Sequence, residues 1–418
     1  MHIISKPFNL FQHCKVNSNN DSERFVGIKI HLNQVQIYFP IGYNLPTDEE
    51  ELKKDVRNLI KILEEFTDNN NNLISNIHSS TTQENLEFPI NAYLNVIKDY
   101  WRRNGKYYTE NKNNYKVKNK GKTHWGKTIK TQTPQVNKNN VIYLNRISKV
   151  NDQNFNSIIT QIHKYCAYES FEKLGWLFTN NKLEKMELNL DKTRLLSLLK
   201  SKLINIYNDL DKNLFKSMIS IINYNDNTID KHQFSLGTEN FEIVWERLID
   251  KFLGIKEKNK YFPRAIWKEK IKPNSNTKTS ALEPDTIMIY DNKYYVLDAK
   301  YYKYGISPKD GVKLLPRSSD INKQITYGQY LNNKLEKDNK QKTVFNAFVM
   351  PFNKDNNEFN IKNWCGNVAE ATGDWISNPK SFEKIQAIVI DTRYLMKNYN
   401  LKNDFMKEKI ANVIEDKN

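Results

Sequence analysis

The most informative part of the sequence is Glu283-Pro284-Asp285 followed by Tyr294-Tyr295-Val296-Leu297-Asp298-Ala299-Lys300. Two short apolar segments, 286–290 and 294–300, flank Asp291-Asn292-Lys293, and this pattern predicts an antiparallel β-hairpin. With the turn centred on Asn292, Thr286 is expected to face Asp298. Asp285 would then lie next to the residue opposite Asp298, at the open end of the hairpin.

Side chains alternate along a strand, so Asp298 and Lys300 are expected on one face of the second strand and Ala299 on the other. Two carboxylates and one ammonium group would then converge on a small volume. Such a set suits phosphodiester hydrolysis, because hard cations such as Mg²⁺ prefer oxygen ligands and activate water for attack on phosphate. Lys300 is expected to orient that water or to stabilise the charge that develops on the phosphate.

The competing interpretation is a surface ion pair at the end of a hairpin, which would contribute at most about 1 kcal/mol. Acid-x-Lys patterns also occur by chance in a lysine-rich chain. However, Tyr295, Val296 and Leu297 make the strand apolar on both faces, which indicates a buried strand. Charges there are costly unless they pair or bind a metal ion, so the pattern favours a catalytic site.

Further site residues are expected on the helices that precede and follow the hairpin. An apolar stripe between Phe241 and Phe252 predicts a helix capped by Thr238. Glu242 lies on the rim of that stripe and Glu246 points farther toward solvent, so Glu242 is the preferred third carboxylate. On a later helix, which Asp320 is expected to cap, the side chains that share one side and could face the same cleft are Lys323, Gln324 and Tyr327.

The chain is strongly basic, with a formal net charge of +16 and a pI near 9.3, which indicates attraction to polyanions and to nucleic acid above all. Its most basic stretch interleaves aromatic side chains with cations, so phosphate contacts and base stacking are expected there; a solvated charged face is the alternative. The candidate DNA-binding residues are Arg102, Arg103, Lys116, Lys118, Lys120, Lys122, Lys127 and Lys130. Arg264 and Trp267 are further candidates, although core packing is favoured for the tryptophan.

Several other classes of protein are disfavoured. The cysteines are widely separated (Cys14, Cys166 and Cys365) and form no CxxC pair, so neither a disulfide framework nor a structural zinc site is expected. The seven histidines form no HxxxH pair, and no GxxxxGK[ST] loop for nucleotide hydrolysis occurs. Without a long apolar run or a secretory signal, a cytoplasmic protein with no membrane contact is expected.

Two domains are expected in 418 residues. An N-terminal α+β domain over 1–225 is expected to recognise DNA, and the polar stretch 223–231 is the predicted boundary. Residues 232–418 are expected to form an α/β domain with a mixed central sheet between helices. The elements expected in the first domain are a hairpin over 25–39, a strand at 141–144, and helices at 47–66, after Pro89, at about 152–176 and at 191–222.

The C-terminal half resembles the PD-(D/E)xK nuclease superfamily and, more narrowly, LlaJI-type restriction endonucleases. The resemblance lies in Phe241 to Glu246, in Pro284-Asp285, in Leu297 to Tyr302, and in Asp320 to Gln324 with Tyr327. It implies a PD-(D/E)xK core that cuts duplex DNA at a short sequence with Mg²⁺, beside a companion methyltransferase that protects the host. Asp285, Asp298 and Lys300 would be catalytic, with Glu242 the additional acid and the three carboxylates the metal ligands. Asp298 stands where the commonest form of the motif has Glu.

A second resemblance, to McrC-like proteins, covers Gly121 to Ile129. McrC-like nucleases work beside a GTP-hydrolysing AAA+ subunit, so two enzymatic hypotheses stand: a type II restriction endonuclease, and the nuclease subunit of a GTP-dependent complex. A double-strand cut needs either two active sites or two successive binding events by one active site. A homodimer on DNA would supply the two active sites. The alternatives to a restriction enzyme are a non-enzymatic DNA-binding protein, an RNase and a repair nuclease.

Overall fold

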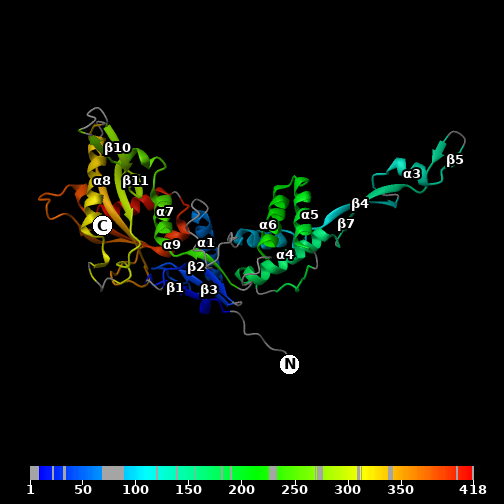
Figure 1. The fold of residues 1–418 in the computed structure, drawn as a ribbon, viewed down its shortest axis with the longest axis horizontal. Helices are drawn as coiled ribbons and strands as arrows, with labels where there is room; N and C mark the ends of the chain where they lie inside the picture. Colours follow the sequence, from blue (N-terminus) through cyan, green and yellow to red (C-terminus); the bar gives the residue numbers. More distant parts are fainter. Residues whose placement is uncertain are drawn as a thin grey trace, which may run out of the picture. The chain divides into compact units, whose positions relative to one another are not determined.

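The computed structural model describes residues 9–20, 23–31, 34–67, 89–118, 121–137, 140–154, 156–179, 182–188, 191–225, 233–268, 270, 276–307, 311, 313–337, 342–401 and 403–416. The chain forms two compact units (Figure 1). Unit 1 comprises residues 1–82 and 232–418, and unit 2 comprises residues 83–231. None of the helices that the structure describes is long and apolar enough to span a membrane.

Unit 1 contains two larger sheets and one two-stranded ribbon, with helices between and around them. Its N-terminal elements are β1 (Cys14–Val16), β2 (Val26–His31), β3 (Gln34–Phe39) and α1 (Glu49–Thr67). The elements that follow unit 2 in the chain are β8 (Gln233–Thr238), α7 (Phe241–Leu253), β9 (Arg264–Lys268), β10 (Asn276–Ala281), β11 (Thr286–Tyr290), β12 (Lys293–Ala299), α8 (Ser318–Lys337), β13 (Val344–Phe352), β14 (Cys365–Ala371), β15 (Ile385–Asp391), α9 (Thr392–Asn398) and α10 (Asp404–Ile414).

The central sheet has the strand order β11-β12-β13-β15-β14. Strands β12, β13 and β15 run parallel, whereas the outer strands β11 and β14 pair antiparallel with their neighbours. β12 is buried from Tyr294 to Ala299 and β15 along its whole length, as expected of interior strands whose sequences are apolar on both faces. The predicted mixed sheet between helices is therefore confirmed.

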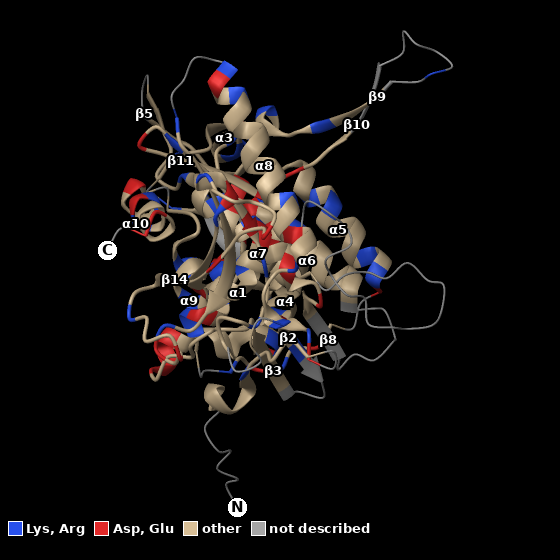
Figure 2. Ribbon diagram, turned by 90° about the vertical axis from the view of Figure 1, so that its left-hand side faces the viewer, with Lys and Arg blue, Asp and Glu red and all other residues tan. Residues whose placement is uncertain are grey.

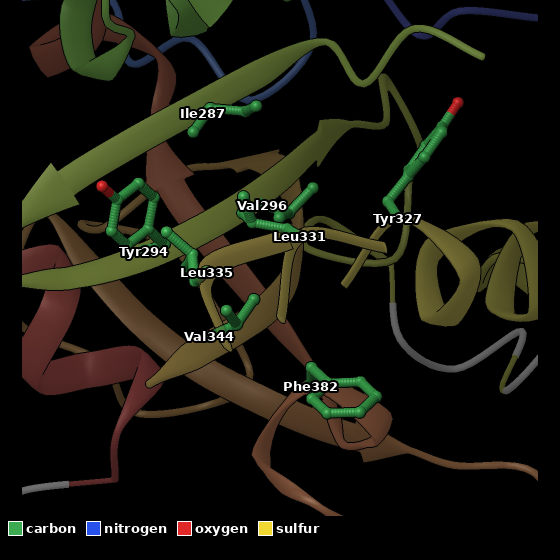
Figure 3. Packing of buried hydrophobic residues seen from close by; sticks show 8 residues of the cluster. All are labelled: Ile287, Tyr294, Val296, Tyr327, Leu331, Leu335, Val344 and Phe382. Carbon is green, nitrogen blue, oxygen red and sulfur yellow. The ribbon is translucent and has the colours of Figure 1, made fainter. Parts of the chain in front are cut away.

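Helix α8 covers one face of this sheet. Val296 of β12 packs with Tyr327, Leu331 and Leu335 of α8, and Figure 3 shows these side chains together with Ile287, Tyr294, Val344 and Phe382 in one buried cluster. Because side chains alternate along β12, Asp298 lies on the same face as Val296. The core thus continues from the hydrophobic cluster directly to the carboxylate.

The first 82 residues belong with the C-terminal part of the chain and not with residues 83–231, which corrects the expectation of one N-terminal domain over 1–225. The predicted boundary at 223–231 coincides with the end of unit 2. The predicted hairpin over 25–39 forms, but its β2 strand also pairs antiparallel with β8, so the sheet order is β1-β3-β2-β8. Gly27 permits this pairing: at φ 146°, a Cβ there would lie 2.1 Å from the Leu236 carbonyl oxygen. Thr238 ends β8 and does not cap α7, which begins after Asn240.

Unit 2 is helical at one end and stranded at the other (Figure 1). Its elements are α2 (Ile90–Arg102), β4 (Glu110–Val117), α3 (Trp125–Thr131), β5 (Gln135–Asn137), β6 (Asn140–Ile142), β7 (Ile147–Asn154), α4 (Ile158–Leu174), α5 (Lys192–Ile204) and α6 (Asp209–Asn225). The helix expected at 191–222 is two helices, and 152–154 belong to a strand. The antiparallel β4–β7 ladder, with α3, β5 and β6 beyond it, extends away from the helices, and we call these elements the arm.

Candidate active site

The β11–β12 hairpin closes through a two-residue turn. Asp291 and Asn292 have φ of 46° and 59°, the conformation that a type I′ turn requires and that Asp and Asn tolerate. Tyr290 therefore pairs with Lys293 and Thr286 with Leu297, one step away from the predicted register. Continued by one residue, this register brings Asp285 opposite Asp298 itself.

Asp285 is held against the end of β12. Its Oδ2 accepts a hydrogen bond of 2.8 Å from the Ala299 amide, and its carbonyl oxygen accepts one from Lys258 Nζ. Burial, together with the neighbouring carboxylates of Asp298 and Glu246, raises the pKa of Asp285 from its ordinary value of 3.8 to about 7. A carboxyl group with a raised pKa beside a second carboxylate is typical of a functional site.

Asp298 is only 3% exposed, and Lys300 Nζ lies 2.7 Å from its Oδ2. This contact is an ion pair outside hydrogen-bond geometry, and within the described part of the chain Asp298 Oδ2 has no hydrogen-bond partner. The ion pair with Lys300 offsets the cost of burying this oxygen, and the oxygen keeps a lone pair that a metal ion could share.

Lys300 is shared between two carboxylates. Besides the contact with Asp298, its Nζ donates a hydrogen bond of 3.0 Å to Oδ1 of Asp320. Burial alone would lower the pKa of Lys300, but Asp298 and Asp320 outweigh it and raise the pKa above its ordinary value. The ammonium group is therefore charged and fixed at neutral pH.

Asp320 is a site residue that the sequence pattern did not identify, because it was assigned to capping. It lies in the first turn of α8, where Oδ2 accepts a hydrogen bond of 3.2 Å from the Arg317 amide. The helix thus begins before Asp320, which corrects the expectation that Asp320 is its cap: one oxygen reaches back to Arg317, and the other binds Lys300. An acid in the first turn of a helix next to a candidate catalytic lysine is a signal that could have indicated this role.

Glu246, and not Glu242, is the glutamate beside the two aspartates. Glu242 is exposed, whereas Glu246 is partly buried and its pKa is raised by burial and then by the charge of Asp298. The expectation that Glu246 points farther toward solvent than Glu242 is therefore wrong. In addition, a helical wheel gives only the angle about the helix axis. Glu242 and Glu246 are separated by about one helical turn, or about 5.4 Å along the axis of α7. The position of α7 along its axis therefore determines which of the two carboxylates lies beside the end of β12. Figure 2 shows acidic segments gathered next to α7 and α8.

The three residues expected on one side of α8 have different surroundings. Gln324 is buried, and its amide donates a hydrogen bond of 2.7 Å to the Val296 carbonyl, so it supports β12. The Tyr327 hydroxyl donates to the Glu283 carbonyl at 3.2 Å, and Figure 3 shows it pointing away from the hydrophobic cluster. Lys323 is exposed. Burial lowers the pKa of Lys323, but Tyr327 and then the charge of Asp298 outweigh burial and raise this pKa above its ordinary value. Lys323 therefore lies within electrostatic range of Asp298.

The donor set fits Mg²⁺. No group of three or more His, Cys, Asp and Glu side chains close enough to hold a metal ion occurs within the described ranges. Mg²⁺ does not require one, because it retains waters and is commonly held by one or two carboxylates together with substrate phosphate. Asp285, partly buried, and Asp298, buried, could supply those carboxylates at the end of β12.

The candidate DNA-binding residues fall into two groups. Arg102 and Arg103 pair with Asp99 and Asp211 among the helices of unit 2, so they are engaged within the fold. Lys120 lies outside the described residues. The other five are exposed on the arm, and we call them the arm lysines: Lys116, Lys118, Lys122, Lys127 and Lys130.

Comparisons with known proteins give three findings. A solved structure, the half-complex of Thermococcus gammatolerans McrB AAA+ hexamers with bound McrC, aligns over 93% of this chain and 83% of its own at 14% identity, with a TM-score of 0.33. A component, YdjA, of the type II restriction enzyme BsuMI from Bacillus subtilis is 29% identical over 271 residues. That alignment covers 61% of this chain and 57% of the relative, so the chain spans little more than half of it.

The third finding covers most of the chain. Residues 25–369 match the family described as LlaJI restriction endonuclease. The match includes the β11–β12 hairpin with Asp285, Asp298 and Lys300, as well as the arm of unit 2. This chain belongs to the LlaJI restriction endonuclease family.

Proposed function

We propose that this chain is a type II restriction endonuclease that makes Mg²⁺-dependent, sequence-specific double-strand cuts in DNA. The observation that carries the proposal is the grouping of Asp285, Asp298 and Lys300, in which Lys300 Nζ lies 2.7 Å from the buried Oδ2 of Asp298. Membership of a restriction endonuclease family supports it. The strand order of the central sheet is compatible with the PD-(D/E)xK core that we propose for it.

In this proposal Asp285 and Asp298 hold Mg²⁺, and Glu246 is the additional acid. Bound Mg²⁺ polarises the scissile phosphate and lowers the pKa of a water molecule. Lys300 holds its positive charge toward the phosphate, where negative charge accumulates during attack. Asp320 keeps the ammonium group in place, since it binds the side of Lys300 that Asp298 leaves free.

The arm is proposed to bind duplex DNA through the arm lysines. Its aromatic side chains lie among them: Lys127 Nζ is 3.5 Å from the centre of the Tyr115 ring, and Trp125 is 53% exposed. Cations contribute affinity by releasing counterions from the phosphate backbone, and exposed rings offer surfaces for stacking. This combination of cations with exposed rings suits nucleic acid better than a face of solvated lysines alone.

The proposal is tested by incubating plasmid and phage-genome DNA with the purified chain and Mg²⁺. Discrete fragments that disappear in EDTA, in Asp298→Ala and in Lys300→Ala are the expected result. Lys384→Ala, which removes an exposed lysine of the same unit, is the matched control and is expected to cut normally. If Asp298→Ala cuts like the unsubstituted chain, these residues are not the catalytic centre.

A second candidate follows from the relative's description as one component of its enzyme. This chain would then be the nuclease subunit of a multi-component system, with an AAA+ GTPase as its motor. Intact DNA with the purified chain, and cleavage only after a neighbouring ATPase and GTP are added, would favour this candidate. Under either candidate, a companion methyltransferase would protect host DNA.

The same assay separates the remaining classes of function. A non-enzymatic DNA-binding protein would bind the plasmid with no activity for Asp298→Ala to remove. An RNase or a repair nuclease would prefer structured RNA or branched DNA when these are offered beside the plasmid. Sedimentation of the chain with and without DNA tests the homodimer that a double-strand cut would use.

A further inference from the structure

The β9–β10 ribbon is a two-stranded element that the proposed catalysis does not use. Its strands pair antiparallel, with Trp267 opposite Thr277, Ile266 opposite Lys278 and, after a register shift, Arg264 opposite Ala281. Figure 2 shows the ribbon extending away from α8 and β11, elements of the same unit. It forms its own sheet and adds no strand to the central one.

Both faces of the ribbon are exposed. Residues 264–267 are exposed consecutively, and successive strand residues point to opposite faces, so neither face is covered there. Trp267 is 68% exposed and Ile266 is 57% exposed, which overturns the expectation that Trp267 packs in the core. An isolated two-stranded ladder gains little stability from such residues, and large exposed apolar side chains mark a surface that meets a partner.

The ribbon is joined to the catalytic hairpin by a short stretch of chain, 282–285. At its base, the Leu282 amide donates a hydrogen bond of 2.8 Å to the Pro263 carbonyl. Ala281, the last residue of β10, is four positions before Asp285, and four residues span at most about 14 Å. A duplex whose scissile phosphate lies at Asp285 would therefore pass the base of the ribbon within about four base pairs of the cut.

Charge identifies the partner. Between Arg264 and Ala281 the sequence contains five cationic residues (Arg264, Lys268, Lys270, Lys272 and Lys278) and a single acidic one, Glu269. Such an excess selects a polyanion, and a two-stranded β-ribbon has the size that the major groove of B-DNA admits. A protein partner would not require this charge.

We infer that the β9–β10 ribbon enters a groove of duplex DNA beside the bond to be cut, with Arg264 on the phosphate backbone and Trp267 against the bases or sugars. The inference rests on the proposed nuclease function, because it places the scissile bond at Asp285. It makes the ribbon a positioning and specificity element that is separate from the arm lysines. Recognition close to the cut would then come from the same unit as catalysis.

The test compares two double variants of the full chain. Arg264→Ala/Trp267→Ala removes one cation and one tryptophan from the ribbon. Trp375→Ala/Lys384→Ala likewise removes one tryptophan and one cation, from exposed positions elsewhere in unit 1, where Trp375 is 60% exposed. Affinity for a fluorescein-labelled duplex several helical turns long is measured by anisotropy with Ca²⁺ in place of Mg²⁺, over a series of salt concentrations. Thermal melting of both variants checks that they fold.

The ribbon variant is expected to bind about tenfold more weakly, with a salt dependence reduced by about one counterion, while the control variant binds like the unsubstituted chain. A photoreactive p-benzoylphenylalanine that replaces Trp267 is expected to crosslink to the duplex, and one that replaces Trp375 is not. Normal binding by the ribbon variant without a crosslink would overturn the inference and leave the nuclease proposal intact if plasmid is still cut. No duplex binding or cutting by the unsubstituted chain would overturn both.

Discussion

Replacing Asp285 by Asn is expected to stabilise the metal-free protein while it abolishes cleavage. The folded protein keeps the Asp285 carboxyl protonated to higher pH than the unfolded chain does, since burial, Asp298 and Glu246 raise its pKa from 3.8 to about 7. Ionisation of Asp285 therefore costs stability as the pH rises from about 4 to about 7, and the full cost is present at pH 8. Asn keeps an oxygen for the Ala299 amide and removes the charge.

The size of the effect follows from the shift. Three pKa units correspond to about 4 kcal/mol, and because the neighbouring carboxylates share the repulsion, we expect a gain near half of that, or about 2 kcal/mol. For a unit of this size, 2 kcal/mol raises the melting temperature by roughly 5 °C. Below pH 4 the gain is expected to vanish, because both folded and unfolded chains then carry a protonated Asp285.

The assay is thermal melting at pH 8 and at pH 4, in EDTA and in Mg²⁺. Mg²⁺ is expected to stabilise the unsubstituted chain, since bound ligand adds to folding free energy, and to have little effect on Asp285→Asn. Asp374→Asn, an exposed aspartate of the same unit, is the control and should melt like the unsubstituted chain throughout. Equal melting of Asp285→Asn and the unsubstituted chain at pH 8 in EDTA would refute the carboxylate cluster.

Three further predictions test the rest of the site. Glu246→Gln is expected to lower the rate of plasmid cleavage about 100-fold and Glu242→Gln less than about threefold, measured at saturating Mg²⁺; the reverse order would restore the helical-wheel assignment. Asp320→Ala is expected to slow cleavage about tenfold because Lys300 loses a hydrogen bond that positions it, with Asp320→Asn closer to normal and DNA affinity unchanged in both. Replacing all five arm lysines by Gln is expected to flatten the slope of log affinity against log salt by up to about 4, and an unchanged slope would place DNA elsewhere.

Much of the fold could be predicted because hydrophobic periodicity is strong where strands and helices are buried. The paired segments 286–290 and 294–300, the interior strands and helix α8 all occur near their expected positions, since each is long or apolar enough to be distinguished. The domain division could not be predicted in the same way. β2 pairs with β8 across about 200 residues of chain, and pairing partners at that separation leave no local signal.

Part of the candidate site's grouping could be predicted, but its geometry could not. Asp285, Asp298 and Lys300 come together, yet the hairpin register differs by one residue because Asp291 and Asn292 both adopt positive φ and shorten the turn. The choice between Glu242 and Glu246 depends on the position of α7 along its axis, which an angular pattern does not contain. Hydrophobic periodicity could not predict the exposure of Trp267 either. The side chains of a strand in a separate ribbon alternate in the same way as those of a strand in one of the two larger sheets.

The segment around Ile41 fixes the end of β12, the strand that carries Asp298. Tyr301, the residue after Lys300, is buried against Phe241 and Trp245 of α7, and its hydroxyl accepts a hydrogen bond of 2.9 Å from the Ile41 amide. The Ile41 carbonyl in turn accepts one of 2.9 Å from the Thr392 hydroxyl at the start of α9. One backbone segment of the first 82 residues therefore fastens the end of β12 to the helix after β15. Carboxylates that repel one another need such support, so a chain cut at residue 232 would lack part of the scaffold of the proposed active site.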